Sequence, residues 1–492
     1  MQAIQQRFFY LFRSTKGLIL VAIAMISLVT AVFGMLSGPM AEFGVRDVVV
    51  RLLHMQLIEA EREARIITLY HSIAMAVVSI EVYFITEFLK MKPRQHATIN
   101  ATITVGYLSV MIFGLLFGYF GHNWIFHGLF ISGQVLVFFS GLMLAVALWP
   151  WKPEARTADK AYSHLGNTSN GKALSLERVA FFTMAVATLG SAIFGAIPGS
   201  YFGNGFEAFL AEDLIRVPEK TLLEDSIIGH LHIMLTLIAI ALALLVGRWL
   251  DYKGMLHKLS MPLMIFGTIV VSLGAWSVVI FPWAHTIIYV GSVFVLLAAL
   301  FLVIFGFSKL IRTRLAEQGI QKAGFWRGFK ALLHDPLKFG MLWQMVFMNF
   351  TVSGIGIFMA VKLDEIFRVW PWREERIVLT GHWHILSGLI ATIILFLYAD
   401  YTGLKGRLRQ WFGWLVILFS DLAFGSVTVF AIKRLFVSET DQQPLVNATM
   451  LLADIGLATV LVVLAVLMVW RLVDLFKRKG KWAKEFEETR LQ

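Results

Sequence analysis

The sequence contains no cysteine, which excludes several kinds of protein chemistry at once. Disulfides, iron–sulfur clusters, thiolate-bound haem and haem attached covalently to the chain all need that residue. Charged residues are also scarce: they occupy 15% of 492 positions, whereas soluble domains carry about 25%. The chain therefore lacks the charge that would cover the surface of a soluble protein of this length.

Long apolar runs are abundant instead. Hydrophobic residues make up 58% of the chain and occur in blocks of about 20, the length that crosses a hydrocarbon core. The first block, from Gly17 to Leu36, has no small-residue cleavage site, so we interpret it as a span and not as a removable signal peptide. We predict twelve transmembrane helices, at about 17–36, 66–89, 99–119, 124–149, 179–197, 226–247, 259–281, 284–308, 339–361, 380–400, 411–432 and 447–473.

Basic residues concentrate in alternate loops between these runs. Most of the 43 Lys and Arg residues would face the cytoplasm if the N-terminus were inside. This distribution predicts an N-in/C-in, multi-pass protein of the inner (cytoplasmic) membrane. The net charge of +11 then reflects topology and contact with membrane lipid, and it does not indicate nucleic-acid binding. The basic loop from Lys309 to Lys338 is either an ordinary inner loop or a surface for anionic lipid or a partner.

Two segments outside the spans have their own predicted structure. Residues 39–65 are expected to form an outer-surface loop, with a short helix from Arg46 to Arg65, and residues 474–492 a basic cytoplasmic tail. The acidic residues of the outer loops could meet a cationic donor protein or simply be solvated.

An internal repeat organises the chain. Three segments of about seventeen residues align without gaps, from 71 to 87, 232 to 248 and 384 to 400. They begin predicted spans 2, 6 and 10, so the unit is four helices repeated three times. We predict one all-α membrane domain over 1–492, with a pseudo-threefold 4+4+4 repeat at approximately 17–149, 179–308 and 339–473.

Five of the 13 histidines lie just inside these three spans, at the predicted outer end; they are His71, His230, His232, His382 and His384. An imidazole in hydrocarbon is costly unless it is paired or bound. Helical residues i and i+2 point about 200° apart, so His382 and His384 can serve two different centres. The layer predicts an imidazole-ligated cofactor, and the alternative is a set of histidines that only hydrogen-bond between helices. Haem and copper suit such ligands, whereas zinc usually needs three or four that converge.

The motif Gly381-His382-Trp383-His384 resembles the tenth helix of heme-copper oxidase subunit I, where Gly/Ala-His-aromatic-His ligates two haems. His71 then stands where that family's second helix provides a haem ligand. The resemblance covers the whole chain and is closest to the divergent B-type members. It implies a low-spin haem on His71 and His384, and a second haem on His382.

Two further motifs extend the resemblance. Gly229-His230 is similar to the Gly-His that opens the family's sixth helix and holds a copper ligand, and His232 is a second candidate there. Lys433-Arg434 resembles the paired arginines that bind haem propionates. The resemblance implies two haems, b-type or related, near the outer side, cytochrome c or quinol as electron donor, and companion respiratory subunits.

The sequence departs from the family at the copper site. Ala275 and Trp276 stand where two adjacent histidines of the seventh helix are expected, and Met234 replaces the sixth-helix tyrosine. We therefore expect copper to be absent, which argues against oxygen reduction at the usual binuclear centre. The catalytic residues stay unassigned, with His230 and Trp276 as candidates for the distal side of the second haem.

Three carboxyl groups lie inside predicted spans: Glu81, Asp421 and Asp454. An intramembrane acid is a candidate for a proton path or a quinol site, and a protonated structural acid is the alternative.

The sequence thus favours a haem-containing membrane oxidoreductase that passes electrons from the first haem to the second. Two related functions stay open: a dihaem b-type cytochrome that only transfers electrons, linked to quinol or cytochrome c, and a small-gas (NO or O2) reductase with an atypical site. A non-redox transporter with histidines in its substrate path is the alternative of another class.

Overall fold

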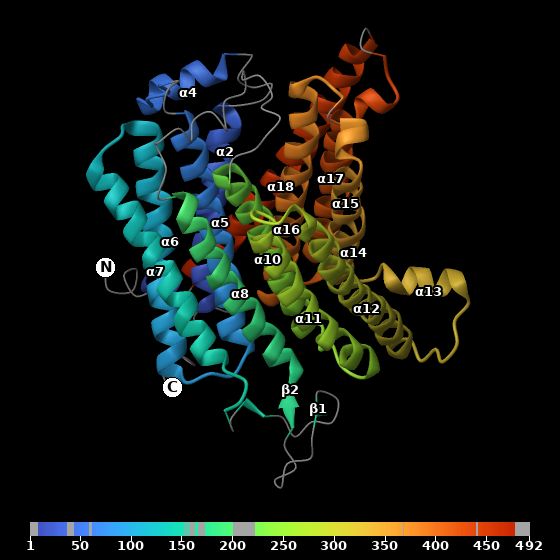
Figure 1. The fold of residues 1–492 in the computed structure, drawn as a ribbon. Coiled ribbons are helices and arrows are strands. Elements are labelled where there is room, and N and C mark those ends of the chain that lie inside the picture. The colour runs from blue at the N-terminus through green and yellow to red at the C-terminus, as the bar shows by residue number, and fades with distance from the viewer. Residues whose placement is uncertain are drawn as a thin grey trace.

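The computed structural model describes residues 8–36, 44–58, 62–152, 155–156, 163–165, 173–199, 222–367, 369–438 and 441–477. Within these ranges twelve helices are long and apolar enough to cross a membrane, so the chain is a multi-pass membrane protein with twelve candidate spans. All twelve predicted spans are confirmed, and the largest difference in bounds is at the eighth, predicted at 284–308 and observed at Pro282–Glu317 (Figure 1). Eleven spans contain one long helix each: α2 (Thr15–Leu36), α5 (Arg62–Phe88), α6 (Pro93–Phe120), α7 (Trp124–Leu148), α8 (Leu176–Gly199), α10 (Leu222–Trp249), α11 (Met255–Ser277), α12 (His285–Glu317), α16 (Trp372–Tyr401), α17 (Gly406–Ala431) and α18 (Gln442–Phe476).

The ninth span is interrupted. It consists of α14 (Pro336–Val346), a π-helical turn at Phe347–Val352 and α15 (Ser353–Val361). Within the turn, the Asn349 side chain donates to the Met345 carbonyl at 2.8 Å. A π-helical turn inserts an extra residue, so it changes which face of the following helix points at its neighbours. Such turns are frequent at functional sites.

Elements outside the spans are short. They include α4 (Val45–Leu53), α13 (Phe325–Leu332), a 3-10 turn at Lys433–Leu435 and two paired antiparallel strands, β1 (Ser163–Leu165) and β2 (Leu174–Ser175). The helix predicted from Arg46 to Arg65 is wrong in its extent. Helix α4 ends at Leu53 because His54 has a left-handed φ of 53°, which a right-handed helix does not continue through. Residues from Arg62 onward already belong to α5. Of the predicted tail at 474–492, residues 478–492 lie outside the described residues.

The same helix crossing occurs three times, between α6 and α7, between α11 and α12, and between α17 and α18. At each, a glycine lies against the backbone of the neighbouring helix so closely that a Cβ would overlap a nitrogen. The pairs and the Cβ–nitrogen distances are Gly133 with Val110 at 2.8 Å, Gly291 with Val271 at 2.5 Å, and Gly456 with Ala423 at 2.9 Å. Close backbone approach at small residues is a common way for membrane helices to associate. Val110, Val271 and Ala423, which contribute these nitrogens, lie equally far along the chain from residues 71, 232 and 384, where the aligned segments begin.

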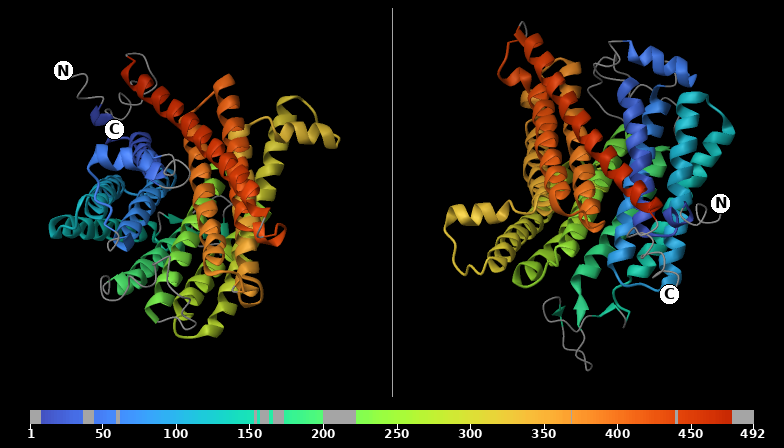
Figure 2. Two further views of the ribbon diagram at one scale, coloured as in Figure 1. Left: turned by 90° about the horizontal axis from the view of Figure 1, so that it is seen from above. Right: turned by 180° about the vertical axis from the view of Figure 1, so that it is seen from behind.

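The three helices that carry the aligned segments, α5, α10 and α16, meet at the end opposite the histidines. The residues directly after the three segments are Phe88, Trp249 and Tyr401. Their ring centroids are separated by 5.4 Å, 5.8 Å and 5.9 Å, so each ring contacts the other two. Figure 2 shows the N-terminal, middle and C-terminal helices as three neighbouring groups.

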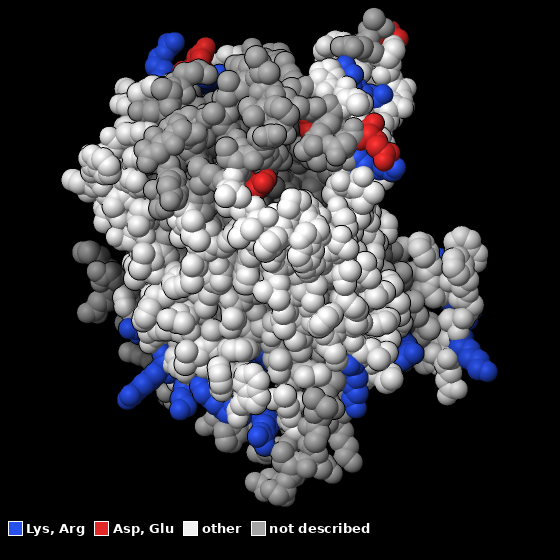
Figure 3. Space-filling model, in the orientation of Figure 1, with Lys and Arg blue, Asp and Glu red and all other residues white. Residues whose placement is uncertain are grey.

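Charged side chains lie mainly at the two ends of the bundle. The middle of the face seen in Figure 3 is a broad uncharged band, and Lys and Arg gather along its lower edge.

The rings of Phe8 and Phe476 contact each other at 5.8 Å, so the first and last described segments lie together.

Candidate functional site

The imidazoles of His71 and His230 lie beside each other between α5 and α10. Their ring centroids are 6.4 Å apart and their planes differ by 15°. Nδ1 of His71 lies 2.9 Å from the carbonyl oxygen of Ile67, and Nδ1 of His230 lies 3.0 Å from that of Ser191. A carbonyl only accepts, so each Nδ1 carries the proton and each Nε2 carries the lone pair. Metal-ligating histidines commonly have this arrangement, in which the second ring nitrogen donates to a carbonyl.

The centroid separation of 6.4 Å is close to that expected for two imidazoles bound to one ion. With a metal–nitrogen bond of about 2.0–2.1 Å and roughly 1.1 Å from nitrogen to ring centre, two opposed imidazoles would have centroids about 6.3 Å apart. In the part of the chain that the structure describes, no place gathers three or more His, Cys, Asp or Glu residues suited to a metal ion. The pair therefore offers at most two imidazole ligands, fewer than a closed zinc cage needs.

Helix α8 positions His230 and its neighbour Trp276. A Cβ on Gly195 would lie 2.2 Å from Nδ1 of His230, so the imidazole occupies the space that a side chain would fill. Trp276 Nε1 donates to the Ser191 hydroxyl at 3.2 Å, and the indole fits against Gly190 in the same way. Sequence reasoning missed the role of this helix. The available signal was the small-residue pattern from Gly190 to Gly195, which permits close helix approach.

A second pair of histidines lies between α10 and α16. His232 belongs to α10 and His382 to α16, and the residue after His382 joins the two helices. The indole of Trp383 contacts His232 edge to face, with centroids 5.3 Å apart. On its other side His382 meets α15, where a Cβ on Gly356 would lie 2.9 Å from Nε2. The side chain of His384 is exposed, so the two histidines of α16 have different surroundings.

The two pairs occupy equivalent positions in the aligned segments. His71 and His232 are first in their segments, while His230 and His382 each stand two residues before a first residue. The third such combination would join His384 to Leu69, which is not a histidine. His71 also contacts the ring of Phe130 at 6.4 Å. The pairing of His71 with His384 stays a prediction from the resemblance.

The cations expected to bind propionates lie directly after α17. Lys433 is 3% exposed and forms an ion pair with Glu374, and its ammonium lies 4.8 Å from the ring centre of Phe430. Arg434 follows in the same 3-10 turn. Because Glu374 already neutralises Lys433, an anionic group bound there would have to compete with this carboxylate.

The three intramembrane acids differ in their surroundings. Asp421 accepts hydrogen bonds from Trp343 at 2.8 Å and Gln344 at 2.9 Å, so it fastens α17 to α14. Asp454 is partly exposed. Glu81 is 4% exposed, and its Oε1 has no hydrogen-bond partner among the described residues. Glu81 is therefore the acid whose burial is least explained by hydrogen bonds to the rest of the structure.

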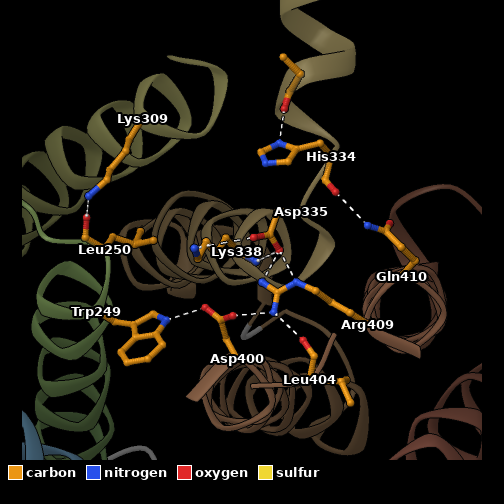
Figure 4. Close-up of polar contacts among 11 residues, drawn as sticks. Trp249, Leu250, Lys309, His334, Asp335, Lys338, Asp400, Leu404, Arg409 and Gln410 are labelled. Atoms are coloured by element: carbon orange, nitrogen blue, oxygen red, sulfur yellow. Dashed lines mark hydrogen bonds and ion pairs between the residues drawn. The ribbon is translucent and has the colours of Figure 1, made fainter. Parts of the chain in front are cut away.

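A polar cluster closes the end opposite the histidines (Figure 4). Arg409 of α17 contacts Asp335, the residue before α14, and Asp400 of α16, both at 2.6 Å. Asp400 also accepts from Trp249 Nε1 at 2.7 Å. The cluster joins α10, α14, α16 and α17. The sequence identified Asp400 only as the end of a repeat and gave no reason to select Arg409.

Comparison with protein-family models, with curated proteins and with solved structures gives no match to this chain.

Proposed function

We propose that the chain is a haem-containing membrane oxidoreductase subunit that transfers electrons through iron held by the histidine layer. The observation that carries this proposal is the His71–His230 pair, with parallel rings 6.4 Å apart and both Nδ1 atoms bonded to carbonyls. The donor set fits haem, because neutral imidazoles with Nε2 lone pairs are the axial ligands of b-type haem iron. Bound haem would supply one-electron chemistry. The chain supplies the ligands, fixes their tautomers and surrounds them with apolar helices.

Two ligand assignments follow from different lines of support. The resemblance assigns His71 and His384 to a low-spin haem and His382 to a second haem, with His230 on the distal side. The ring contact instead pairs His71 with His230, and the equivalent positions in the aligned segments pair His232 with His382. Both assignments place His71 and His382 at different irons, and they differ in the partner of His71.

The proposed architecture is three four-helix repeats around a pseudo-threefold axis. The three glycine crossings and the three mutually contacting aromatic residues at the ends of α5, α10 and α16 support it. We place the lower edge in Figure 3 in the cytoplasm, because Lys and Arg gather there. The histidine layer then faces the outer side of an inner membrane. Electrons would come from cytochrome c or quinol, with other respiratory subunits as partners.

The surroundings of Trp276 support an electron-transfer role over the usual oxygen chemistry. Its indole is held by Ser191 and packs against Gly190, at the position where the resemblance expects a copper ligand. A small-gas reductase would need an open position on the second iron. A non-redox transporter stays the alternative of another class.

Absorption spectra of single alanine variants test the proposal. His71→Ala and His382→Ala should remove different components of the haem spectrum. If the ligand assignment from the resemblance is correct, His384→Ala should remove the same component as His71→Ala. If the assignment from the ring contact is correct, His230→Ala should remove that component instead. His334→Ala is the control, since His334 lies beside the opposite polar cluster (Figure 4). A wild-type protein with no Soret band would contradict the proposal and favour the transporter.

A further inference from the structure

The connection from α12 to α14 leaves and rejoins the same end of the bundle. Before the connection begins, Lys309 within α12 donates to the Leu250 carbonyl, just after α10, at 2.7 Å. At its end Asp335 pairs with Arg409 (Figure 4). Between these two anchors α13 projects outward from the side of the bundle, across the direction of the spans, at a level above the lower ends of α11 and α12 in Figure 1 (see also Figure 2).

Helix α13 has three distinct faces. Successive helical residues turn by about 100°, which places its eight residues in three sectors of similar width. The aromatic sector contains Phe325, Trp326 and Phe329; the basic sector contains Arg327 and Lys330; the third contains Gly328, Ala331 and Leu332. Ala331 is 4% exposed, so this third sector faces the protein.

The aromatic sector is open. Phe325 is 79% exposed, Trp326 72% and Phe329 44%. The three rings contact one another at centroid distances of 5.4–6.5 Å, so they form one continuous apolar patch. On a chain with twelve candidate spans, such a patch at the end of the bundle has the composition of a membrane–water interface, where aromatic rings gather.

The charge beside this patch has one sign. Lys322, Arg327 and Lys330 are exposed, and the sequence from Gln318 to His334 contains no acidic residue. Their positive charge is therefore not neutralised within this stretch. A basic face next to an aromatic face is the arrangement of helices that lie in an anionic membrane surface.

We propose that α13 lies in the headgroup layer of the leaflet at this end of the bundle and, with Lys322, binds anionic phospholipids. The aromatic sector enters the boundary of the acyl chains, and the basic sector contacts lipid phosphates. This site requires no haem, so it is independent of the proposed redox function.

The depth of α13 can be measured directly because the chain has no native cysteine. A nitroxide on Phe329→Cys, in nanodiscs of phosphatidylcholine and phosphatidylglycerol, should be relaxed more by oxygen than by a water-soluble nickel complex. A nitroxide on Lys405→Cys, at an exposed residue between α16 and α17, should show the opposite preference. Preferential access of nickel to position 329 would overturn the proposal. Shielding of that position from both reagents in native membrane vesicles would also overturn it, because a protein partner would then cover the helix.

The lipid specificity has a matched control. The triple variant Lys322→Gln, Arg327→Gln, Lys330→Gln should bind phosphatidylglycerol about a hundred-fold more weakly, at about five-fold per cation. The control triple replaces Lys90 and Lys92, in the loop between α5 and α6, and Arg94, in the first turn of α6; all three are also exposed and basic. We expect the control to retain its phosphatidylglycerol in native mass spectrometry of protein released from nanodiscs. Equal loss in both triples, or no loss in the first, would contradict a site at α13.

Discussion

Replacing Gly195 with alanine should disturb the His71–His230 pair although neither histidine is substituted. The new Cβ would lie 2.2 Å from Nδ1 of His230, whereas ordinary contacts begin at 3.4 Å. The imidazole must therefore move by about 1.2 Å, which is the difference between these two distances. A movement of this size breaks the 3.0 Å bond to the Ser191 carbonyl. It also exceeds the roughly 0.2 Å within which metal–ligand distances are held.

The free-energy change follows from the same overlap. Overpacking costs about 1–3 kcal/mol, and the lost hydrogen bond costs about 1 kcal/mol. Alanine regains up to about 1 kcal/mol in a helix interior, which leaves a net destabilisation of about 1–3 kcal/mol. Gly199→Ala, on the same helix, is the control, because a Cβ at Gly199 would meet nothing within 4 Å.

Both effects can be measured on the same preparation. Unfolding in mixed micelles should show the loss of stability, and the visible spectrum should show loss of the component that depends on His230. The reasoning is refuted if Gly195→Ala and Gly199→Ala unfold alike and have the wild-type spectrum.

Three other variants or measurements address separate parts of the structure. Arg409→Gln removes the cation paired with Asp400 and leaves Asp335 only Lys338 at 3.8 Å, so it should destabilise the protein by about 3 kcal/mol in the same unfolding assay. By contrast, Arg314→Gln at the exposed pair with Glu317 should change stability by less than about 0.5 kcal/mol. Gly356→Ala should alter the spectral component that depends on His382, and Gly354→Ala, whose Cβ meets nothing, should leave it unchanged. Copper should stay far below one per chain after chelator washing, because Trp276 occupies the expected ligand position; stoichiometric copper would show that this interpretation is wrong.

The positions of the spans could be predicted from the sequence because the bilayer sets a minimum apolar length that few other structures need. The extent of α4 could not, since its end depends on the backbone conformation of one residue, His54. The π-helical turn at Phe347–Val352 was also missed, because its apolar and small residues suit a regular helix equally well.

The residues of the candidate site are a prediction from the sequence, whereas their contacts come from the structure. The aligned segments place five histidines at one depth, and this follows from sequence register alone. Which two rings meet depends on how far each helix is rotated about its axis. Helices that are apolar on every side carry little periodic signal for that rotation. Equal depth favoured His71 with His384, whereas the packing of α8 against α10 brings His230 to His71.

The central claim is that the histidine layer holds haem, and haem extraction combined with iron analysis tests it most directly. Protein purified from haem-replete cells should show a Soret band and release non-covalent b-type or related haem, about two per chain, with matching iron. A colourless protein with iron at background level would contradict the account.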